Sequence, residues 1–411
     1  MDYKEKALKL HGENQGKIEI SSKVKLENKD DLSLAYTPGV AEPCREIHKD
    51  VEKIYEYTSK GNMVAVITDG SAVLGLGDIG AEASLPVMEG KSVLFKFFSG
   101  LDAFPICLKT QDVDEIVKTI KILEPVFGGI NLEDISAPRC FHIEERLKNE
   151  VNIPVFHDDQ HGTAIVVTAG LFNAIKVSGK SLTELKVVIN GAGAAGIAII
   201  KLLIRLGVKE VILCDSSGII YPGRSKDMNA YKENIAKLIK TNTNGTLADA
   251  LRGADVFIGV SVAGVLTKEM IQLMNKEPFI FALANPVPEI MPEDAWEAGA
   301  SIVATGRSDF SNQINNVLAF PGVLKGAMEV RATDINMEMK ISAARAIAGL
   351  ILEKELNPRY IIPDVFDERV APGVAAAVAR AAIKTGVARK EISPETVYFR
   401  TRQVINLDHK D

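Results

Sequence analysis

The sequence predicts an α/β protein with two domains, an N-terminal α/β domain and a doubly wound domain that ends in a helical tail. A chain of 411 residues is longer than one hydrophobic core usually supports, which indicates two domains. Short apolar segments of strand type alternate with longer helical segments in both halves, a pattern typical of parallel sheets covered by helices. We place the domains at residues 1–157 and 158–411, with the helical extension starting at about residue 336.

The composition argues against several classes of protein. A formal net charge of −6 disfavours a surface for polyanions, so we expect no nucleic acid as a partner. The N-terminus lacks the apolar stretch of a secretory signal, and no apolar run approaches the ~20 residues of a membrane-spanning helix, so we expect no membrane partner. The four cysteines lack CxxC spacing, which favours reduced thiols and a cytoplasmic location over disulfides or a zinc site.

A dinucleotide-binding unit is predicted at residues 185–215. An apolar strand leads into a GxGxxG loop, a long apolar helix follows, and a second strand ends in Asp215. In a Rossmann unit of this kind the pyrophosphate meets the helix N-terminus and the acidic side chain accepts from a ribose hydroxyl. Asp215 would repel a 2′-phosphate and so favours NAD, while Arg224 keeps NADP as an alternative. The predicted cofactor loop consists of Gly191, Ala192, Gly193, Ala194, Ala195 and Gly196.

The alternation continues beyond this unit, with strands expected at residues 254–259, 279–283 and 301–304. Asn285 and Asn315 lie in loops that follow the last two of these strands. Ligands in open α/β sheets bind at the carboxyl ends of strands, so both amides are candidates for ligand recognition. Asparagine in loops also serves turn formation, and that interpretation stays open.

Two pairs of carboxylates lie near strand ends. Glu133 and Asp134 follow an apolar segment, whereas Asp158 and Asp159 follow an apolar strand and precede a helix that we expect to open at about Thr163. One aspartate could cap that helix, which would leave the other, and two neighbouring histidines, unexplained. Mg²⁺ or Mn²⁺ is satisfied by a few carboxylates, water and substrate oxygens, whereas no set of histidines and cysteines has zinc spacing.

Two further candidates, Tyr36 and Lys91, lie in the first half. Tyr36 is held in an irregular loop at residues 32–45, where a tyrosine usually just packs its ring. Lys91 precedes a strand expected at residues 92–98, and a lysine in that place is usually solvated. Beside a metal ion in a closed site, however, a lysine could lose its proton and serve as a base.

A second formal GxGxxG occurs at residues 75–80, after an apolar strand at residues 63–68. Pro86 and Gly90 interrupt the segment that follows, so we expect no long helix there. We interpret this sequence as a tight backbone turn near a ligand, not as the main dinucleotide loop.

Taken together, these blocks resemble the malic enzymes of the short bacterial type. The resemblance covers about residues 32–330, with the blocks AYTPGVAEPC, TDGSAVLGLGDIG, PVMEGKSVLFKFF, GGINLEDISAPRCF, FHDDQHGTAIVV, GAGAAGIAI, ANPVPEI and NNVLAFPG in this order. So many blocks in one order are highly specific. Larger eukaryotic members carry an arginine before the LGLGD turn that grips a substrate carboxylate. This chain has Ser71, Ala72 and Val73 there, so the grip must come from elsewhere.

The resemblance implies a role for each candidate side chain. Tyr36 would be the general acid and Lys91 the general base. Asn285 and Asn315 would contact substrate or nicotinamide, and the protein would be a homodimer, as members commonly are. The divalent metal would be bound by Glu133, Asp134 and Asp159, with Asp158 supporting them.

The expected reaction is therefore the oxidative decarboxylation of L-malate to pyruvate and CO₂, with reduction of NAD or NADP and a requirement for Mg²⁺ or Mn²⁺. Two alternatives remain open. A malolactic-type lyase would use the same groups, retain NAD and release lactate. A non-catalytic NAD-binding regulator would need only the Rossmann half, which leaves the carboxylates, Lys91 and Tyr36 without a purpose.

Overall fold

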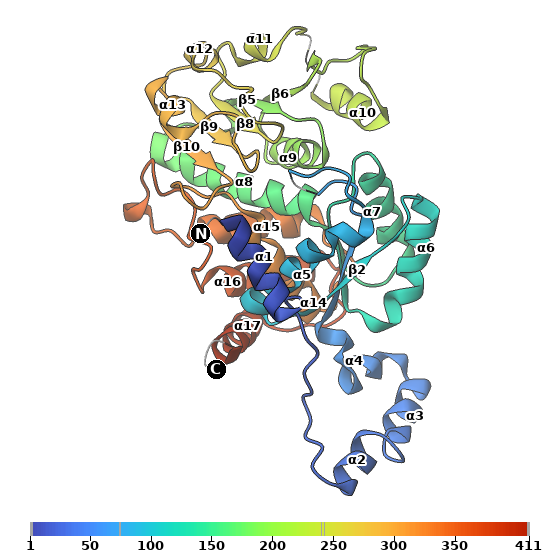
Figure 1. The fold of residues 1–411 in the computed structure, drawn as a ribbon. Coiled ribbons are helices and arrows are strands. Elements are labelled where there is room, and N and C mark those ends of the chain that lie inside the picture. Colours follow the sequence, from blue (N-terminus) through green and yellow to red (C-terminus); the bar gives the residue numbers. More distant parts are fainter. Residues whose placement is uncertain (1–2, 74, 240, 242, 409–411) are drawn as a thin grey trace.

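The computed structural model describes residues 3–73, 75–239, 241 and 243–408, and it contains two sheets built mainly of parallel strands (Figure 1). The first sheet has four parallel strands in the order β2-β1-β3-β4. Its strands are β1 (Met63–Thr68), β2 (Asp102–Cys107), β3 (Gly129–Leu132) and β4 (Val155–His157). None of the helices in the described part of the chain combines the length and the apolar character that a bilayer crossing needs.

The helices of the first lobe differ from the sequence prediction in one important place. Residues 80–99 form one helix of 20 residues with Pro86 inside it, so both the expected strand at residues 92–98 and the absence of a long helix after the second GxGxxG were wrong. The buried residues of this helix follow a helical spacing along one face, whereas Val93, Leu94 and Phe97 between them are apolar but partly exposed, which gives the segment a strand-like apolar run in sequence. The helices are α5 (Gly80–Ser99), α6 (Val113–Leu123) and α7 (Arg139–Glu150).

The second sheet has six strands in the order β10-β9-β8-β5-β6-β7, and only the short edge strand β7 is antiparallel. Strand order reverses beside β5, which is the doubly wound arrangement that the sequence predicts. The strands are β5 (Lys186–Asn190), β6 (Glu210–Asp215), β7 (Gly218–Ile219), β8 (Val256–Gly259), β9 (Phe279–Ala282) and β10 (Ile302–Thr305). The helices are α8 (Asp158–Ser178), α9 (Ala194–Arg205), α10 (Ala230–Ile239), α11 (Leu247–Leu251), α12 (Lys268–Gln272) and α13 (Pro292–Glu297).

The C-terminal helices return to the first lobe. Helix α14 packs on α5, where the rings of Phe95 and Phe320 meet edge to face with centroids 4.8 Å apart. Helix α15 packs on α8 and α16, and α17 packs on α16 and α5. One hydrophobic core therefore runs from the first sheet through α8 into the tail. These helices are α14 (Phe320–Glu329), α15 (Met337–Ala348), α16 (Val370–Lys384) and α17 (Pro394–Asp408).

The N-terminal helices form an arm with no buried residue. Figure 1 shows that the chain leaves α1 in an extended segment and reaches α2 and α3 well away from the body. The expected loop at residues 32–45 therefore consists largely of two short helices separated by a turn. Helix α1 (Tyr3–Asn14) ends beside the body, where the N–H of Lys17 donates to Glu89 on α5. The arm comprises α2 (Lys29–Ala35), α3 (Ala41–Lys49) and α4 (Ile54–Tyr57), and all four helices leave every side chain partly or fully exposed.

Candidate active site

The two acidic pairs meet at one edge of the first sheet. Strands β3 and β4 run parallel with Leu132 opposite His157, so the residues that follow each strand lie side by side. Oxygen atoms of Glu133, Asp134 and Asp159 all lie within 4.8 Å of one another. Carboxylates that are 25 positions apart in the chain are thus brought to one point by the pairing of their strands.

The backbone at this point is arranged around the acidic side chains. Asp134 has a left-handed conformation with φ of 52°, which is uncommon for a residue other than glycine. In this conformation its N–H donates to Asp159 Oδ2 at 2.9 Å, and its C=O accepts from the N–H of Ala72 at 2.9 Å. The turn therefore links the ends of β1, β3 and α8.

Helix α8 begins earlier than the sequence suggests. It opens at Asp158, not at Thr163, so both aspartates lie in its first turn, near the positive end of the helix dipole. The cap is His157, whose Nδ1 accepts from the N–H of Gln160 at 3.3 Å, so neither aspartate caps the helix. This contact also explains one of the two histidines that the sequence left without a role.

Asp158 is fully buried and is oriented by its neighbours. Its Oδ2 accepts from Asn316 Nδ2 at 2.5 Å, and its Oδ1 lies where a Cβ on Gly162 would be only 1.8 Å away. A side chain at position 162 would therefore displace this carboxylate. Oδ1 has no hydrogen-bond partner among the described residues.

Lys91 lies on α5 and points into the acidic cluster. Its Nζ donates to Asp158 Oδ2 at 2.6 Å, lies 2.8 Å from Glu133 Oε1 and sits 4.0 Å from the ring centroid of Phe320. The side chain is buried, so the interpretation of a solvated lysine is wrong. Lys91 itself lies on α5, the helix that replaces the strand expected at residues 92–98.

Burial and charge oppose each other at this cluster. Burial works against the charge of Lys91, but the carboxylates of Asp158 and Glu133 outweigh it and hold the pKa of Lys91 above its ordinary value. Burial also raises the pKa of Asp134 to about 9, and the neighbouring Asp159 and Glu133 add to this shift. One lysine does not balance four carboxylates, so the cluster has an excess of negative charge.

This donor set fits a hard divalent cation. Carboxylate oxygens are the ligands that Mg²⁺ and Mn²⁺ prefer, and a bound cation would remove the repulsion that raises the pKa of Asp134. The cysteine thiol at position 140 and the ring of His161 make no part of the cluster, which excludes a zinc set of sulfur and nitrogen ligands there. Glu133, Asp134 and Asp159 are the residues that could hold the metal.

Tyr36 is not brought to this cluster within one chain. It ends α2 on the projecting arm with 68% of its surface exposed, whereas Lys91 lies inside the body on α5 (Figure 1). The arm helices α2 and α3 also expose Leu32, Leu34 and Val40. Contiguous exposed apolar side chains of this kind are typical of surfaces that contact another molecule.

The dinucleotide loop has the geometry that its glycines predict. Gly193 caps α9, so the N-terminus of that helix faces the loop. Gly191 has φ of +123°, and a Cβ there would lie 2.4 Å from the carbonyl oxygen of Val260. The turn therefore tolerates no side chain at position 191, and the free N–H groups at the start of α9 are placed to bind a pyrophosphate.

Asp215 is more heavily paired than the sequence suggests. The guanidinium group of Arg224 donates to both carboxylate oxygens of Asp215. Lys232 Nζ donates to Oδ2 at 2.7 Å, and the N–H of Ser217 donates to Oδ1 at 2.9 Å. Although burial works against the charge, these partners lower the pKa of Asp215 to about 2. Two cations therefore accompany one carboxylate at the position expected for the ribose.

The asparagines at the strand ends differ in how far their side chains are engaged in hydrogen bonds within the protein. Asn312, with φ of 56°, is buried and binds the carbonyl groups of Val303 and Pro358, so it is structural. The Oδ1 atom of Asn315 caps a short helical turn. Asn285 makes one long contact, 3.4 Å from its Nδ2 to a carbonyl oxygen.

Two residues at or beside the cluster were not among the predicted site residues. Asn316, next to the predicted Asn315, is the amide that binds Asp158. Arg139 pairs with Asp69 at the end of β1 at 3.0 Å, and its buried Nε has no hydrogen-bond partner among the described residues. The sequence around Arg139 gave no signal for this pair, because Asp69 comes near Arg139 only through the pairing of β1 with β3 in the sheet.

Two family models match the chain. The model described as "Malic enzyme, N-terminal domain" matches residues 15–148, and "Malic enzyme, NAD binding domain" matches residues 160–383. The two matched ranges leave out only the chain ends and the residues around β4.

Known relatives extend over nearly the whole chain. The bifunctional malic/malolactic enzyme of Bacillus subtilis (strain 168) is 66% identical over 405 residues, which cover 98% of this chain and 99% of that protein. The probable NADP-dependent malic enzyme of Rickettsia prowazekii (strain Madrid E) is 54% identical over 401 residues, covering 93% of this chain and 52% of that protein. The crystal structure of malic enzyme from Pyrococcus horikoshii Ot3 superposes with a TM-score of 0.94 at 48% identity, covering 99% of this chain and 96% of that one.

Proposed function

The chain belongs to the malic enzyme family of NAD(P)-dependent oxidoreductases, and we propose that it converts L-malate to pyruvate and CO₂ with a divalent cation at Glu133, Asp134 and Asp159. The observation that supports this most directly is the convergence of these carboxylates beside Lys91 Nζ. Family membership sets aside the alternative of a non-catalytic NAD-binding regulator.

The side chains of the cluster divide the proton chemistry. Neutral Lys91 takes the proton of the malate hydroxyl, and Asp158, whose Oδ2 lies 2.6 Å from Lys91 Nζ, orients its amine. A divalent cation held by Glu133, Asp134 and Asp159 would supply positive charge that acidifies the malate hydroxyl, offsets the carboxylate charge that keeps Lys91 protonated and favours the negative charge that develops as CO₂ leaves. Tyr36 then donates a proton to C3 of enolpyruvate.

We propose that Tyr36 reaches the site of a second copy in a homodimer. Tyr36 lies on the exposed arm, far from Lys91 of its own chain, and the arm presents Leu32 and Leu34 to solvent. Short helices gain stability when their exposed apolar side chains become buried against another surface. Exchange of arms between two identical chains would bury them and complete both sites.

NAD is the proposed cofactor, with NADP also accepted. The free N–H groups of α9 bind the pyrophosphate, and Asp215 accepts from the ribose, as in other Rossmann units. Arg224 and Lys232 compensate the charge of Asp215, so the repulsion of a 2′-phosphate is weaker than the sequence alone suggests. The four free cysteines support a cytoplasmic location.

An assay with malate, NAD or NADP, and Mn²⁺ tests the oxidative reaction. We expect NADH formation that requires malate, stops with a chelator and returns when Mn²⁺ is added in excess. Failure of added Mn²⁺ to restore a chelated enzyme would contradict the metal site. Activity with lactate or isocitrate in place of malate would contradict the substrate.

A malolactic activity is the second candidate, because the Bacillus subtilis relative is described as bifunctional. The two reactions differ in product, so pyruvate and lactate are both measured in the same reaction. One NADH per malate consumed, with pyruvate as product, supports the oxidative reaction. Malate consumption with lactate as product and no net NADH shows the malolactic one.

A further inference from the structure

Glu289 is a fully buried carboxylate that lies outside the acidic cluster, in the loop that follows β9. Its Oε1 accepts from the N–H of Ser261 at 2.9 Å and from the hydroxyl of Ser261 at 3.2 Å, and its Oε2 accepts from the N–H of Ala284 at 2.9 Å. In the described part of the chain these donors, and no cationic side chain, are its partners. A buried carboxylate is costly unless both oxygens are satisfied, and here two different loops satisfy them.

Strand β8 leaves room for this carboxylate at its end. Gly259 is the last residue of β8, and a Cβ there would lie 2.4 Å from the carboxyl carbon of Glu289. A side chain at position 259 would therefore displace the carboxylate. The backbone of Glu289 adds a further contact, because its C=O accepts from the N–H of Leu266 at 3.1 Å. The loops that follow β8 and β9 are thus joined through one residue.

The loop after β8 also forms a wall of the dinucleotide loop. Ser261 Oγ accepts from Asn190 Nδ2 at 2.9 Å, and the N–H of Val260 donates to the C=O of Asn190 at 2.9 Å. The carbonyl oxygen of Val260 is the atom that a side chain at position 191 would meet. Asn190 ends β5 and directly precedes the dinucleotide loop, so Ser261 has a fixed position relative to that loop.

The loop after β9 carries Asn285, the amide that is a candidate for contact with malate or nicotinamide. Ala284, whose N–H donates to Glu289, immediately precedes it. The side chain of Asn285 lies against the loop after β10, since a Cβ on Gly306 would be 2.6 Å from Asn285 Nδ2. The Nδ2 atom makes a long contact, 3.4 Å to the C=O of Leu283, so the anchored backbone does more than this hydrogen bond to set the position of the amide.

We propose that Glu289 is a positioning residue, which fixes the Asn285 amide relative to the dinucleotide loop by binding the loops after β8 and β9 at once. The inference rests on the proposed function, in which malate and the nicotinamide meet at this amide. A carboxylate suits the role, because it only accepts and its two oxygens can meet N–H donors from two loops. A carboxamide has one acceptor oxygen, so at position 289 its NH₂ group would face an N–H donor.

The two parts of the cofactor site should respond differently when this carboxylate is lost. The dinucleotide loop keeps the hydrogen bond from the N–H of Gly191 to the C=O of Cys214 at 2.9 Å, which does not involve Glu289. Binding of ADP-ribose, which lacks the nicotinamide, should therefore persist. The Asn285 amide loses its support, and a displacement of about 1 Å at reacting groups lowers rates by about 100-fold.

The first test combines steady-state kinetics at saturating NAD and Mn²⁺ with calorimetric titration of ADP-ribose. For Glu289→Gln we expect kcat/KM for malate to fall about 100-fold, while the Kd for ADP-ribose changes less than about threefold. Glu293→Gln, the same substitution at an exposed position on α13, is the matched control and should behave like the wild type. A normal kcat/KM in Glu289→Gln, or an equal loss of malate turnover and ADP-ribose affinity, would overturn the proposal.

A second variant reaches the same amide from the opposite side. Gly306→Ala places a methyl group against Asn285 Nδ2, at the end of a side chain that can turn away, so the protein should still fold. We expect lower kcat/KM for malate with ADP-ribose binding retained. The double variant with Glu289→Gln should lose less activity than the product of the two single losses, because both act on one amide. Losses that multiply would show that Glu289 does not act through Asn285, and the proposal would be wrong.

Hydrogen–deuterium exchange, followed by mass spectrometry, tests the two loops without malate turnover. In Glu289→Gln the segments at residues 259–266 and 283–290 should exchange faster than in the wild type, because an N–H donor in them loses its acceptor. Unchanged exchange in both segments would overturn the proposal whatever the substrate of the enzyme. A wild type that forms no NADH from malate would contradict the proposed function, and faster exchange in the variant would still support the link between the loops.

Discussion

The exchange of Tyr36 between subunits can be tested by mixing two inactive enzymes. Tyr36→Phe removes the proposed acid, and Lys91→Ala removes the proposed base, so each homodimer should be nearly inactive. The structure places the two side chains on separate parts of one chain, the exposed arm and the buried cluster. The mixture therefore shows whether a site is built from one chain or from two.

The expected recovery follows from the symmetry of a dimer. Dissociation and random reassociation of equal amounts gives about half heterodimers. If Tyr36 acts in the partner's site, each heterodimer has one site with both substitutions and one with neither. About a quarter of all sites would then be intact, and the mixture should recover about a quarter of wild-type activity. If Tyr36 acts in its own chain, every site keeps one substitution and nothing is recovered.

The assay is malate-dependent NADH formation in the presence of Mn²⁺. Two different affinity tags allow the heterodimer to be isolated, which should raise the recovery to about half of wild type. Each variant, dissociated and reassociated alone, is the control. Isolated heterodimer without activity would refute the exchange of arms, and a monomer by light scattering would refute the homodimer itself.

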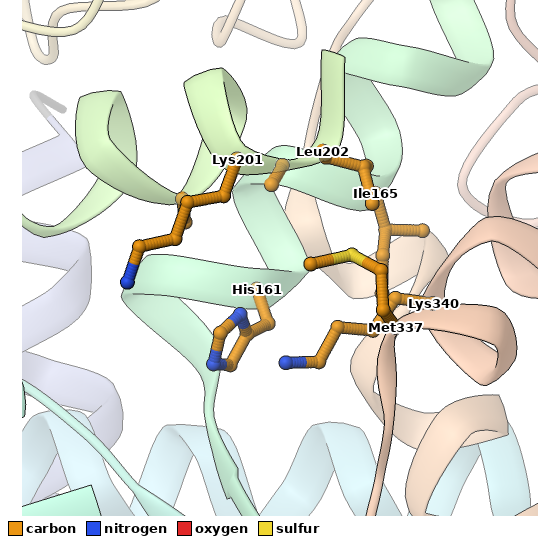
Figure 2. A pocket seen from close by; sticks show the side chains of 8 residues that line it. His161, Ile165, Lys201, Leu202, Met337 and Lys340 are labelled. Atoms are coloured by element: carbon orange, nitrogen blue, oxygen red, sulfur yellow. The ribbon is translucent and has the colours of Figure 1, made fainter. Parts of the chain in front are cut away.

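Four further predictions concern single residues. Lys91→Ala should lower kcat by roughly 100- to 10,000-fold, and near-normal turnover would show that another group is the base. Asp159→Asn should raise the Mn²⁺ concentration for half-maximal activity more than about tenfold, measured by metal titration of the chelated enzyme. Asp215→Asn leaves Arg224 and Lys232 without their counter-charge, so the ratio of kcat/KM for NADP to that for NAD should rise about tenfold; an unchanged ratio would exclude Asp215 from the ribose site. Lys340→Met removes a buried amine that points toward His161 (Figure 2), so it should raise the apparent Tm at about pH 7, and the gain should shrink toward pH 10. The pKa of Lys340 is about 7 in the folded protein and 10.5 ordinarily, so between these values Lys340 binds its proton only in the unfolded chain. The free energy of unfolding of the wild type therefore rises with pH by up to about 1.4 kcal/mol per pH unit in this range. A gain in Tm that is independent of pH would contradict this reasoning.

The sequence determined the dinucleotide-binding unit and the identity of the acidic residues. Local order sufficed for the unit, because strand, glycine loop, helix and acidic strand end are contiguous at residues 185–215. Local sequence order did not suffice for Lys91, because the apolar run after it fits a helix as well as a strand. Only the packing of α5 on β1, β2 and α14 shows that this segment is a helix.

Only the tertiary structure decided how distant residues combine. The pairing of β3 with β4 brings Glu133 to Asp159, and α5 then inserts Lys91 between carboxylates that no sequence spacing relates to it. The same holds for Arg224 and Lys232, which turn Asp215 from a free acceptor into a compensated one. Periodicity and motifs report contacts between neighbours in the chain, whereas strand order and helix packing set the distances between charges, and those distances determine the pKa values and the chemistry of the site.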